Sequence, residues 1–359
     1  MEGHPLGRTP RLAPGITSAL LAAFLFGASA PCAKLLLRHV GAVVLAGLLY
    51  LGAGAGLTLL WLWRRAWDTE TGVIERQDIP WLTAAIVCGG VLGPVLLMLG
   101  LARMPAASAS LLLNLENVFT ALIAWFVVHE HHDRRIVLGM VLIALAGLLL
   151  ARQGYTSLGS VLGPLAVVGA CLCWALDNNL TRHVAAGDPV LIAAVKGVVA
   201  GSVNVAVAML AGERFPPLLP LATAALVGFL GYGVSLVFFV TALRHIGTSR
   251  TSAYFSAAPF VGAAIALAWL HESEGAIFWV AAGFMGIGLW LHLAERHVHA
   301  HNHEALAHNH RHRHDAHHGH AHDFPWDGRE PHAHRHIHEP LTHSHPHYPD
   351  IHHRHGHEP

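Results

Sequence analysis

The sequence predicts an all-α integral membrane protein whose ten transmembrane helices form two inverted five-helix repeats. The first observation is composition, since 53% of the 359 residues are hydrophobic and only 12% are Asp, Glu, Lys or Arg. A soluble domain carries about 25% charged residues. The second observation is a series of apolar runs of roughly 20 residues, the length that crosses a bilayer as a helix. The third is an internal duplication of the chain.

Ten apolar runs of this length follow one another between residues 16 and 294. Most of the links between them are short and contain Gly or Pro, so we expect successive helices to be antiparallel neighbours. A longer polar link covers residues 64 to 80. The predicted spans are 16–37, 41–63, 81–102, 106–128, 135–151, 163–185, 189–211, 220–242, 248–270 and 275–294.

The Lys and Arg residues predict the orientation of these helices, because short cytoplasmic loops accumulate positive charge. With the N-terminus inside, the opposite side holds only Arg38, Arg103, Arg152 and Arg214. The cytoplasmic segments then hold Arg8, Arg11, Arg64, Arg65, Arg76, Arg134, Arg135, Arg182, Arg244, Arg250 and Arg296. We therefore expect both termini on the cytoplasmic side of a bacterial inner membrane.

A cleaved signal peptide is the alternative interpretation of the N-terminus. Arg8 and Arg11 precede an apolar run that ends in Ala28-Ser29-Ala30, a pattern that such peptides share. Cleavage would remove the first span, which the internal repeat requires. We therefore expect the first span to be retained.

Two short motifs recur at nearly the same spacing. Arg38-His39-Val40 follows the first span, and Arg182-His183-Val184 follows the sixth, 144 residues later. His129-Glu130 ends the fourth span, and His271-Glu272 ends the ninth, 142 residues later. One duplication with a two-residue insertion or deletion explains both offsets. Because five is an odd number of helices, the halves are inverted, which places a solute site near the bilayer midplane between them.

This duplication divides the chain into five parts. They are a cytoplasmic N-terminal segment (1–15), the first repeat (16–151), a linker (152–162), the second repeat (163–294) and a His-rich cytoplasmic tail (295–359). The tail has little apolar surface to bury, so we expect it to be disordered.

The fourth and ninth spans, LENVFTALIAWFVVHE and SAAPFVGAAIALAWLHE, each close on a Glu. Together with ten helices in two five-helix halves and short loops, they resemble the drug/metabolite transporter superfamily, EamA type, over residues 16 to 294. The resemblance implies a secondary carrier of small solutes, commonly an exporter. The proline usual in the fourth helix of that superfamily is replaced here by Asn117, while Pro259 keeps it in the ninth.

Polar residues inside the spans mark the candidate solute cavity. An ionisable group at a helix centre costs about 3 kcal/mol to insert into a membrane, so it should face the bundle interior. Within the fourth, sixth and seventh spans, such residues recur at spacings that place them on one side of each helix. They are Asn114, Glu116 and Asn117; Trp174, Asp177 and Asn178; and Lys196 and Asn204.

Asp177 and Lys196 lie equally far from the turn of a helical hairpin, so they should reach the same depth. We expect an ion pair between them, which is either a structural link between the two helices or a part of the cavity. Gly197 and Gly201 form a GxxxG pattern that favours close helix packing nearby.

Glu116 has no charged partner at its own depth, and burial favours its neutral, protonated form. We expect it to bind the solute or to take up and release a proton that drives transport. The structural alternative is a protonated Glu116 hydrogen-bonded to an Asn across a helix interface. Glu116 and Asp177 are balanced in number by Lys34 and Lys196. That balance suits a zwitterionic or neutral metabolite better than a divalent cation.

Histidines alternate with other residues along the tail, and neutral imidazole is a ligand for nickel, cobalt, zinc and copper. We expect the tail to bind such an ion, while the membrane part requires no cofactor. The alternative is a pH-responsive tail that becomes cationic in acid and binds anionic lipids. The candidate metal ligands are His299, His301, His303, His308, His310, His312, His314, His332, His334, His336 and His338.

The HExxH signature of zinc hydrolases is incomplete at residues 129–133, because Asp133 stands where the second His is required. An enzyme is therefore not expected. The four cysteines lie in apolar runs and imply no disulfide framework. The 22 basic and 22 acidic residues give no sign of nucleic-acid binding.

The sequence therefore predicts a permease that moves a small solute by rocking of its two repeats. One alternative is a divalent-metal exporter that is loaded by the tail. Another is a membrane-anchored metal store or sensor that transports nothing. The expected partners are the lipid bilayer and the solute, and a homodimer is compatible with the sequence.

Overall fold

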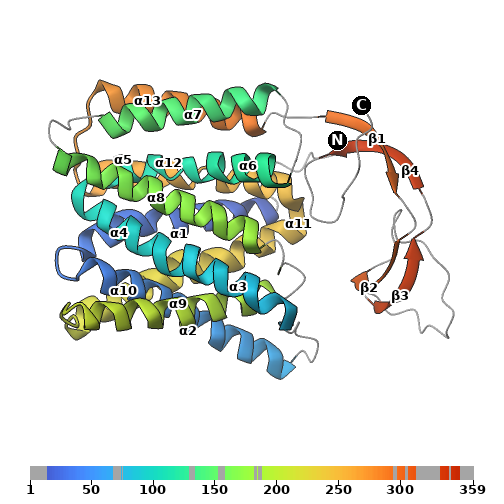
Figure 1. Cartoon of the computed structure of the whole chain (residues 1–359), viewed down its shortest axis with the longest axis horizontal. Helices are drawn as coiled ribbons and strands as arrows, with labels where there is room; N and C mark the ends of the chain where they lie inside the picture. The colour runs from blue at the N-terminus through green and yellow to red at the C-terminus, as the bar shows by residue number, and fades with distance from the viewer. Residues whose placement is uncertain are drawn as a thin grey trace, which may run out of the picture. The chain divides into compact units, whose positions relative to one another are not determined.

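The computed structural model describes residues 14–67, 74, 76–128, 134–152, 158–181, 184, 188–293, 297–303, 306–312, 332–338 and 341–347. The chain divides into two units, Met1–Ala294 and Glu295–Pro359, and each is described by itself. The first unit contains the helices, which lie side by side along one direction (Figure 1).

Apolar segments form the helices of the first half. Pro80 lies in the first turn of its helix, where the missing backbone N–H has no intrahelical partner to lose. The elements are α1 (Pro14–Leu36), α2 (Ala42–Trp67), η1 (Arg76–Asp78), α3 (Ile79–Ala85), η2 (Ile86–Leu92), α4 (Gly93–Arg103), α5 (Ala106–Leu112), α6 (Leu115–Val128) and α7 (Arg134–Arg152).

The second half follows the same order. Asp188 caps α9 (Pro189–Leu210), because its carboxylate accepts a hydrogen bond from Val190 N at 2.8 Å. Gly247, with φ of 78°, ends the eighth span in a backbone conformation that favours glycine. The elements are α8 (Leu158–Thr181), α9 (Pro189–Leu210), α10 (Leu218–Gly228), η4 (Phe229–Val234), α11 (Ser235–Phe255), α12 (Ala258–Trp269) and α13 (Ala276–Leu293).

Nine helical stretches among the described residues are long and apolar enough to cross a membrane. Ala276–Leu291 is a shorter apolar helix that corresponds to the tenth predicted span. The predicted helical membrane fold is therefore confirmed. Large apolar side chains, including Phe126, Leu210 and Leu218, are exposed on the bundle, as lipid-facing residues are.

The two halves carry the same interruptions at matching positions. The third span contains the π-helix η2, and the eighth contains the π-helix η4, which begins 143 residues later. The fourth span breaks at Leu113-Asn114 and the ninth at Ser256-Ala257, again 143 residues apart. These offsets lie between the two spacings of the sequence motifs, so one duplication accounts for all of them.

Contacts between helices are related by exchange of the two halves. α2 packs on α9, and α7 packs on α13, so each of these helices meets its own counterpart (Figure 1). The contact of α1 with α11 corresponds to that of α8 with α4, and the contact of α1 with α12 corresponds to that of α8 with α6. Exchange of the halves maps this pattern onto itself, as inverted repeats require.

Close packing of α2 against its neighbours depends on glycines. A Cβ on Gly197 of α9 would lie 2.7 Å from Gly54 Cα, and Gly201 approaches α2 as closely one turn later. On α10, a Cβ on Gly228 would lie 1.9 Å from the Leu49 carbonyl oxygen. A side chain larger than hydrogen at these points would separate the helices.

The second unit contains four strands, β1 (His297–His303), β2 (Leu306–His312), β3 (His332–His338) and β4 (Leu341–His347). β1 pairs antiparallel with β4, and β2 pairs antiparallel with β3, which gives two separate two-stranded ribbons. The alternation of His with other residues has the two-residue period of a strand, and pairing satisfies the backbone groups. The disordered tail expected from the sequence stays a prediction.

Replacing Gly228 by Ala should destabilise the helical unit, because the added methyl group would overlap the Leu49 carbonyl and push α10 away from α2. Overpacking of this kind costs about 1–3 kcal/mol. Gly283→Ala is the matched control, since a Cβ there meets nothing within 4 Å and Ala favours a helix. Thermal unfolding in detergent should give a lower Tm for Gly228→Ala only. Equal Tm values for the two variants would contradict the close contact.

Candidate functional site

The π-helix η2 lies at the centre of a polar region inside the bundle. The Gly89 carbonyl accepts hydrogen bonds from the Tyr50 hydroxyl at 2.8 Å and from the Trp174 indole N–H at 2.9 Å. The Asn204 amide donates to the next two carbonyls, at 3.2 and 3.4 Å. A π-helix widens the turn and is frequent at functional sites. Here it presents three successive carbonyls to α2, α8 and α9.

An ion pair joins α8 and α9 beside this π-helix. Lys196 Nζ lies 2.5 and 2.7 Å from the two carboxylate oxygens of Asp177, and Thr181 donates to the same carboxylate at 2.9 Å. The ion pair expected from the sequence is thus present. Only 11% of the Asp177 side chain and 17% of the Lys196 side chain are exposed, so each charge depends on the other.

Gly89 allows the ion pair to pack against η2. A Cβ on Gly89 would lie 2.0 Å from Asp177 Oδ2. Any larger residue at this position would displace the carboxylate from Lys196. Gly89 therefore serves the polar region twice, through its carbonyl and through its missing side chain.

Glu116 of α6 accepts a hydrogen bond from Asn178 of α8 at 2.8 Å, one residue beyond Asp177. Glu116 lies in the first turn of α6, directly after the break in the fourth span. At that position the helix dipole favours a negative charge. The half-buried carboxyl group thus has one amide donor and a helix N-terminus in its surroundings, while the ammonium of Lys196 is engaged by Asp177.

Two residues of the predicted site have other surroundings. Asn114 is fully buried at the break of the fourth span, where its amide donates to the Leu111 carbonyl at 2.9 Å and contacts the Met285 sulfur at 3.8 Å. It supports the interrupted helix rather than the polar region around η2. Asn117 is exposed on α6, and its role in solute binding stays a prediction.

Lys34 also lies outside the polar region, which corrects the charge balance expected from the sequence. Its ammonium donates to two backbone carbonyls at the end of α4, at 2.5 and 3.0 Å. That helix end lies about two and a half turns beyond η2. The described residues of the polar region thus supply two carboxyl groups, those of Glu116 and Asp177, and one ammonium group, that of Lys196.

Tyr50, Gly89 and Tyr232 belong to this region, although the sequence did not indicate them. The rings of Tyr50 and Tyr232 contact each other with centroids 5.7 Å apart, and Tyr232 also meets Phe26 of α1 at 5.8 Å. A tyrosine inside an apolar span needs a hydrogen-bond partner, and that signal could have identified Tyr50. No local pattern identifies Gly89 as the residue that provides the accepting carbonyl.

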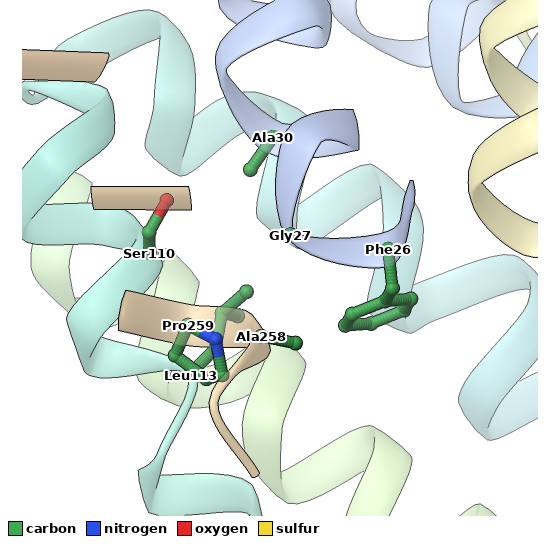
Figure 2. A pocket seen from close by; sticks show the side chains of 7 residues that line it. All are labelled: Phe26, Gly27, Ala30, Ser110, Leu113, Ala258 and Pro259. Atoms are coloured by element: carbon green, nitrogen blue, oxygen red, sulfur yellow. The ribbon is translucent and has the colours of Figure 1, made fainter. Parts of the chain in front are cut away.

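A small apolar pocket lies where α1 passes the breaks in the fourth and ninth spans. Figure 2 shows its lining, which includes the buried Ser110, whose hydroxyl has no partner among the described residues. The pocket has room for about one water molecule and is too small for a solute. Its lining residues are Phe26, Gly27, Ala30, Ser110, Leu113, Ala258 and Pro259.

Glutamates at one end of the bundle cap helices of the other half. Glu272 accepts hydrogen bonds from the backbone N–H groups of Ala106 and Ala107, both at 2.8 Å, at the start of α5. Glu213 does the same at the start of α2, at 2.9 and 3.3 Å. Glu272 of the second His-Glu motif is thus a helix cap. The first copy of the motif, within 129–133, lies outside the described residues.

Among the residues with described side chains, no three His, Cys, Asp or Glu side chains gather into a metal-binding group. The predicted metal ligands lie in the tail, where the structure describes the backbone of the four strands. His314 lies outside the described residues. Metal binding by the tail therefore stays a prediction.

Apolar helices in two inverted repeats, with interrupted spans around a polar region, define a multi-pass membrane transporter. The sequence profile of the EamA-like transporter family matches residues 13–152 and 161–294. The chain belongs to this family.

Proteins similar to this chain agree with that assignment. An uncharacterized transporter of Methanothermobacter thermautotrophicus is 29% identical over 289 residues, which cover 76% of this chain and 83% of that protein. The uncharacterized transporter YyaM of Bacillus subtilis is 23% identical over 205 residues, which cover 54% of this chain and 67% of that protein. A protein of known crystal structure shares the fold, with a TM-score of 0.58 and 16% identity over 77% of this chain and 95% of that chain.

Breaking the ion pair from one side should destabilise the protein. Asp177→Asn leaves the Lys196 ammonium largely buried without its carboxylate, and loss of one partner of a buried pair costs about 3–5 kcal/mol. The double variant Asp177→Asn/Lys196→Met removes both charges and should recover most of that loss. Thermal unfolding in detergent measures both effects. A single variant as stable as the wild type would show that the pair does not hold α8 to α9.

Proposed function

We propose that this protein is a secondary transporter that exports a small zwitterionic or cationic organic solute across a bacterial cytoplasmic membrane in exchange for protons, with both termini cytoplasmic. The observation that carries the proposal is the placement of Glu116, Asp177 and Lys196 beside η2 and the break in the fourth span. Ionisable groups inside a membrane bundle are costly, and they mark solute and proton pathways.

Glu116 is the group that exchanges the proton. Because Asp177 is paired with Lys196, the region is neutral while Glu116 is protonated and gains a negative charge when Glu116 loses its proton. The ionised carboxylate then attracts the ammonium group of a solute. A proton that reaches Glu116 from the other side of the membrane displaces the solute. Competition for one carboxyl group thus couples the two movements.

An organic solute fits these surroundings better than a bare divalent ion. Both carboxylate oxygens of Asp177 are occupied by Lys196, whereas divalent ions take several oxygen or nitrogen ligands at once. The Tyr50 hydroxyl and the Trp174 indole N–H both donate to the Gly89 carbonyl. The faces of these two aromatic rings can attract an ammonium group.

Buried polar atoms near the polar region supply further contacts for a solute. Thr120 Oγ1, Asn179 Oδ1 and Asn204 Oδ1 are buried and have no partner in the part of the chain that the structure describes. Asn179 and Thr120 are neighbours across α6 and α8, since the Asn179 amide donates to the Thr120 carbonyl at 3.4 Å. Buried polar atoms in proteins almost always have a partner. These atoms are therefore suited to bind a polar solute or the water that replaces it.

Glu116→Gln should abolish export and preserve the fold, because Gln keeps an oxygen that can accept from Asn178 but has no proton to release. Glu116→Asp retains a carboxyl group and should retain part of the activity. Cells with matched protein levels would express the wild type, either variant, or a chain ended after Glu295. Mass spectrometry would then compare organic metabolites and Ni, Co, Zn and Cu inside and outside the cells.

The same measurement separates the alternatives. An organic solute that leaves cells with the wild type and the truncated chain, but not with Glu116→Gln, would support the proposal. A metal whose export requires Glu116 would make that metal the solute and the tail its loading arm. Metal retention that survives Glu116→Gln and disappears on truncation would indicate a store. Wild-type export by Glu116→Gln would exclude coupling through Glu116.

Alternating access requires that contacts at one end of the bundle break in each cycle. With cytoplasmic termini, the end that contains residues 104–106 and 270–275 is the outer end. Contacts that close it are those of Lys34 with α4, those of Glu272 with α5, and a hydrogen bond from Ser108 to Glu274 at 2.8 Å. We propose that these contacts form the outer gate.

Glu272→Ala should open the outer gate more often. Loss of a helix cap costs about 0.5–2 kcal/mol, which corresponds to a shift of roughly two- to thirtyfold in the ratio of closed to open forms. Ser108→Cys, in a chain whose native cysteines are replaced, would report opening through labelling by a membrane-impermeant maleimide added outside the cell. Ser273→Ala is the control at an exposed neighbour. Equal labelling rates with Glu272→Ala and Ser273→Ala would argue against the gate.

A further inference from the structure

We propose that a water-filled entrance between α6 and α8 leads to Glu116 from the end of the bundle at which these two helices end, and that the solute and protons pass through it. Asn117 of α6 and Asn178 of α8 line the entrance. The proposal rests on the proposed function and deepens it, because it assigns the route by which Glu116 exchanges its proton and meets the solute.

Asn178 is exposed on the side of α8 that faces away from lipid. The large apolar side chains exposed on α8 are Leu162, Leu165, Leu172 and Leu176, and their spacing places them on one side of the helix. Asn178 follows Leu176 by two residues and is exposed as well. Two residues correspond to a rotation of about 200° around a helix. The exposed amide of Asn178 therefore points away from the exposed leucines.

A second exposed amide belongs to α6, which packs on α8 (Figure 1). Asn117 is exposed and lies about two and a half turns before the exposed Phe126, so these two side chains point to opposite sides of α6. Both exposed amides are close to Glu116. Asn117 is its neighbour in the chain, and Asn178 donates a hydrogen bond to its carboxyl group at 2.8 Å.

Water suits this surface better than lipid does. An amide in hydrocarbon loses the hydrogen bonds that it makes to water, and polar side chains within membrane spans face the protein interior or a water-filled cavity. Buried polar atoms nearby also lack a partner among the described residues, namely Thr120 Oγ1, one turn after Glu116, and Asn179 Oδ1. Water in the entrance would supply partners to these atoms.

The entrance opens at one end of the bundle only. Asn178 lies about 4.5 Å along the helix axis from Thr181, where α8 ends. The opposite end contains the contacts that we propose as the outer gate, including those of Glu272 with α5 and of Ser108 with Glu274. With cytoplasmic termini, the entrance is therefore on the cytoplasmic side.

The entrance gives Glu116 an exchange route while the outer gate is closed. The O–H bond of its protonated carboxyl group breaks, the proton passes to a water molecule of the entrance, and a carboxylate remains. The ammonium group of a solute that enters by the same route then binds to this carboxylate. Each amide of Asn117 and Asn178 offers two N–H donors and an oxygen acceptor without a charge of its own, so both can contact a zwitterionic or cationic solute.

Cysteine labelling in a chain whose four native cysteines are replaced tests the entrance. Asn178→Cys and Asn117→Cys each place a thiol in it. Leu176→Cys is the matched control, because Leu176 is exposed two residues away on the opposite side of the same helix. Arg214→Cys, at an exposed position in the link between α9 and α10 at the opposite end of the bundle, marks the other side of the membrane. Membrane vesicles of both orientations would be treated with a charged, membrane-impermeant maleimide.

We expect Asn178→Cys and Asn117→Cys to react at least about tenfold faster than Leu176→Cys, because the reactive thiolate forms in water and a charge is strongly disfavoured in hydrocarbon. Both should react faster from the side opposite to the one from which Arg214→Cys reacts. This comparison holds whichever end of the bundle is cytoplasmic. Labelling requires no transported solute, so a failure of the entrance is distinct from a failure of export through Glu116.

Two results would overturn the proposal. If both entrance variants react as slowly as Leu176→Cys, the amides do not face water. If both react faster from the side that labels Arg214→Cys, the route to Glu116 opens at the other end of the bundle. Size-exclusion chromatography in detergent would verify that each variant is folded, and should one of the two entrance variants not fold, the other decides.

Discussion

The backbone polar groups inside the helical bundle must find their partners within the protein, because the hydrocarbon core of a membrane offers none. The π-helix η2 shows how this constraint organises the polar region. Its widened turn leaves carbonyls available, and Tyr50, Trp174 and Asn204, from three different helices, bond to them. These bonds fix the positions of α2, α8 and α9 around η2. The ion pair between Asp177 and Lys196 depends on that arrangement.

The breaks in the fourth and ninth spans obey the same constraint. Asn114 donates to the carbonyl three residues before it at the first break, and Ser256 does the same at 2.6 Å at the second. Across the first break, backbone N–H groups donate hydrogen bonds to the carbonyl oxygen three residues earlier in the chain. These bonds satisfy part of the backbone at the breaks, and the first break leaves a new helix N-terminus at Glu116.

The duplication has diverged at the two π-helices and at the helix breaks beside them. An offset of 143 residues relates Gly89 of η2 to Tyr232 of η4, and an offset of 142 relates Asn117 to Pro259. The apolar pocket lies beside Pro259, whereas the corresponding part of the first half contains Glu116. Glu116, Asp177 and Lys196 thus lie in the region around η2 and not around its counterpart η4.

The sequence by itself determined the membrane fold, its duplication and the ionisable residues of the spans, because apolar runs cross a bilayer as helices and charges among them are conspicuous. Only the tertiary structure decided which polar residues share a site. Asn114 and Lys34 bond to helix ends, whereas Tyr50 and Gly89 join the polar region, and hydrogen bonds between distant segments leave no local pattern.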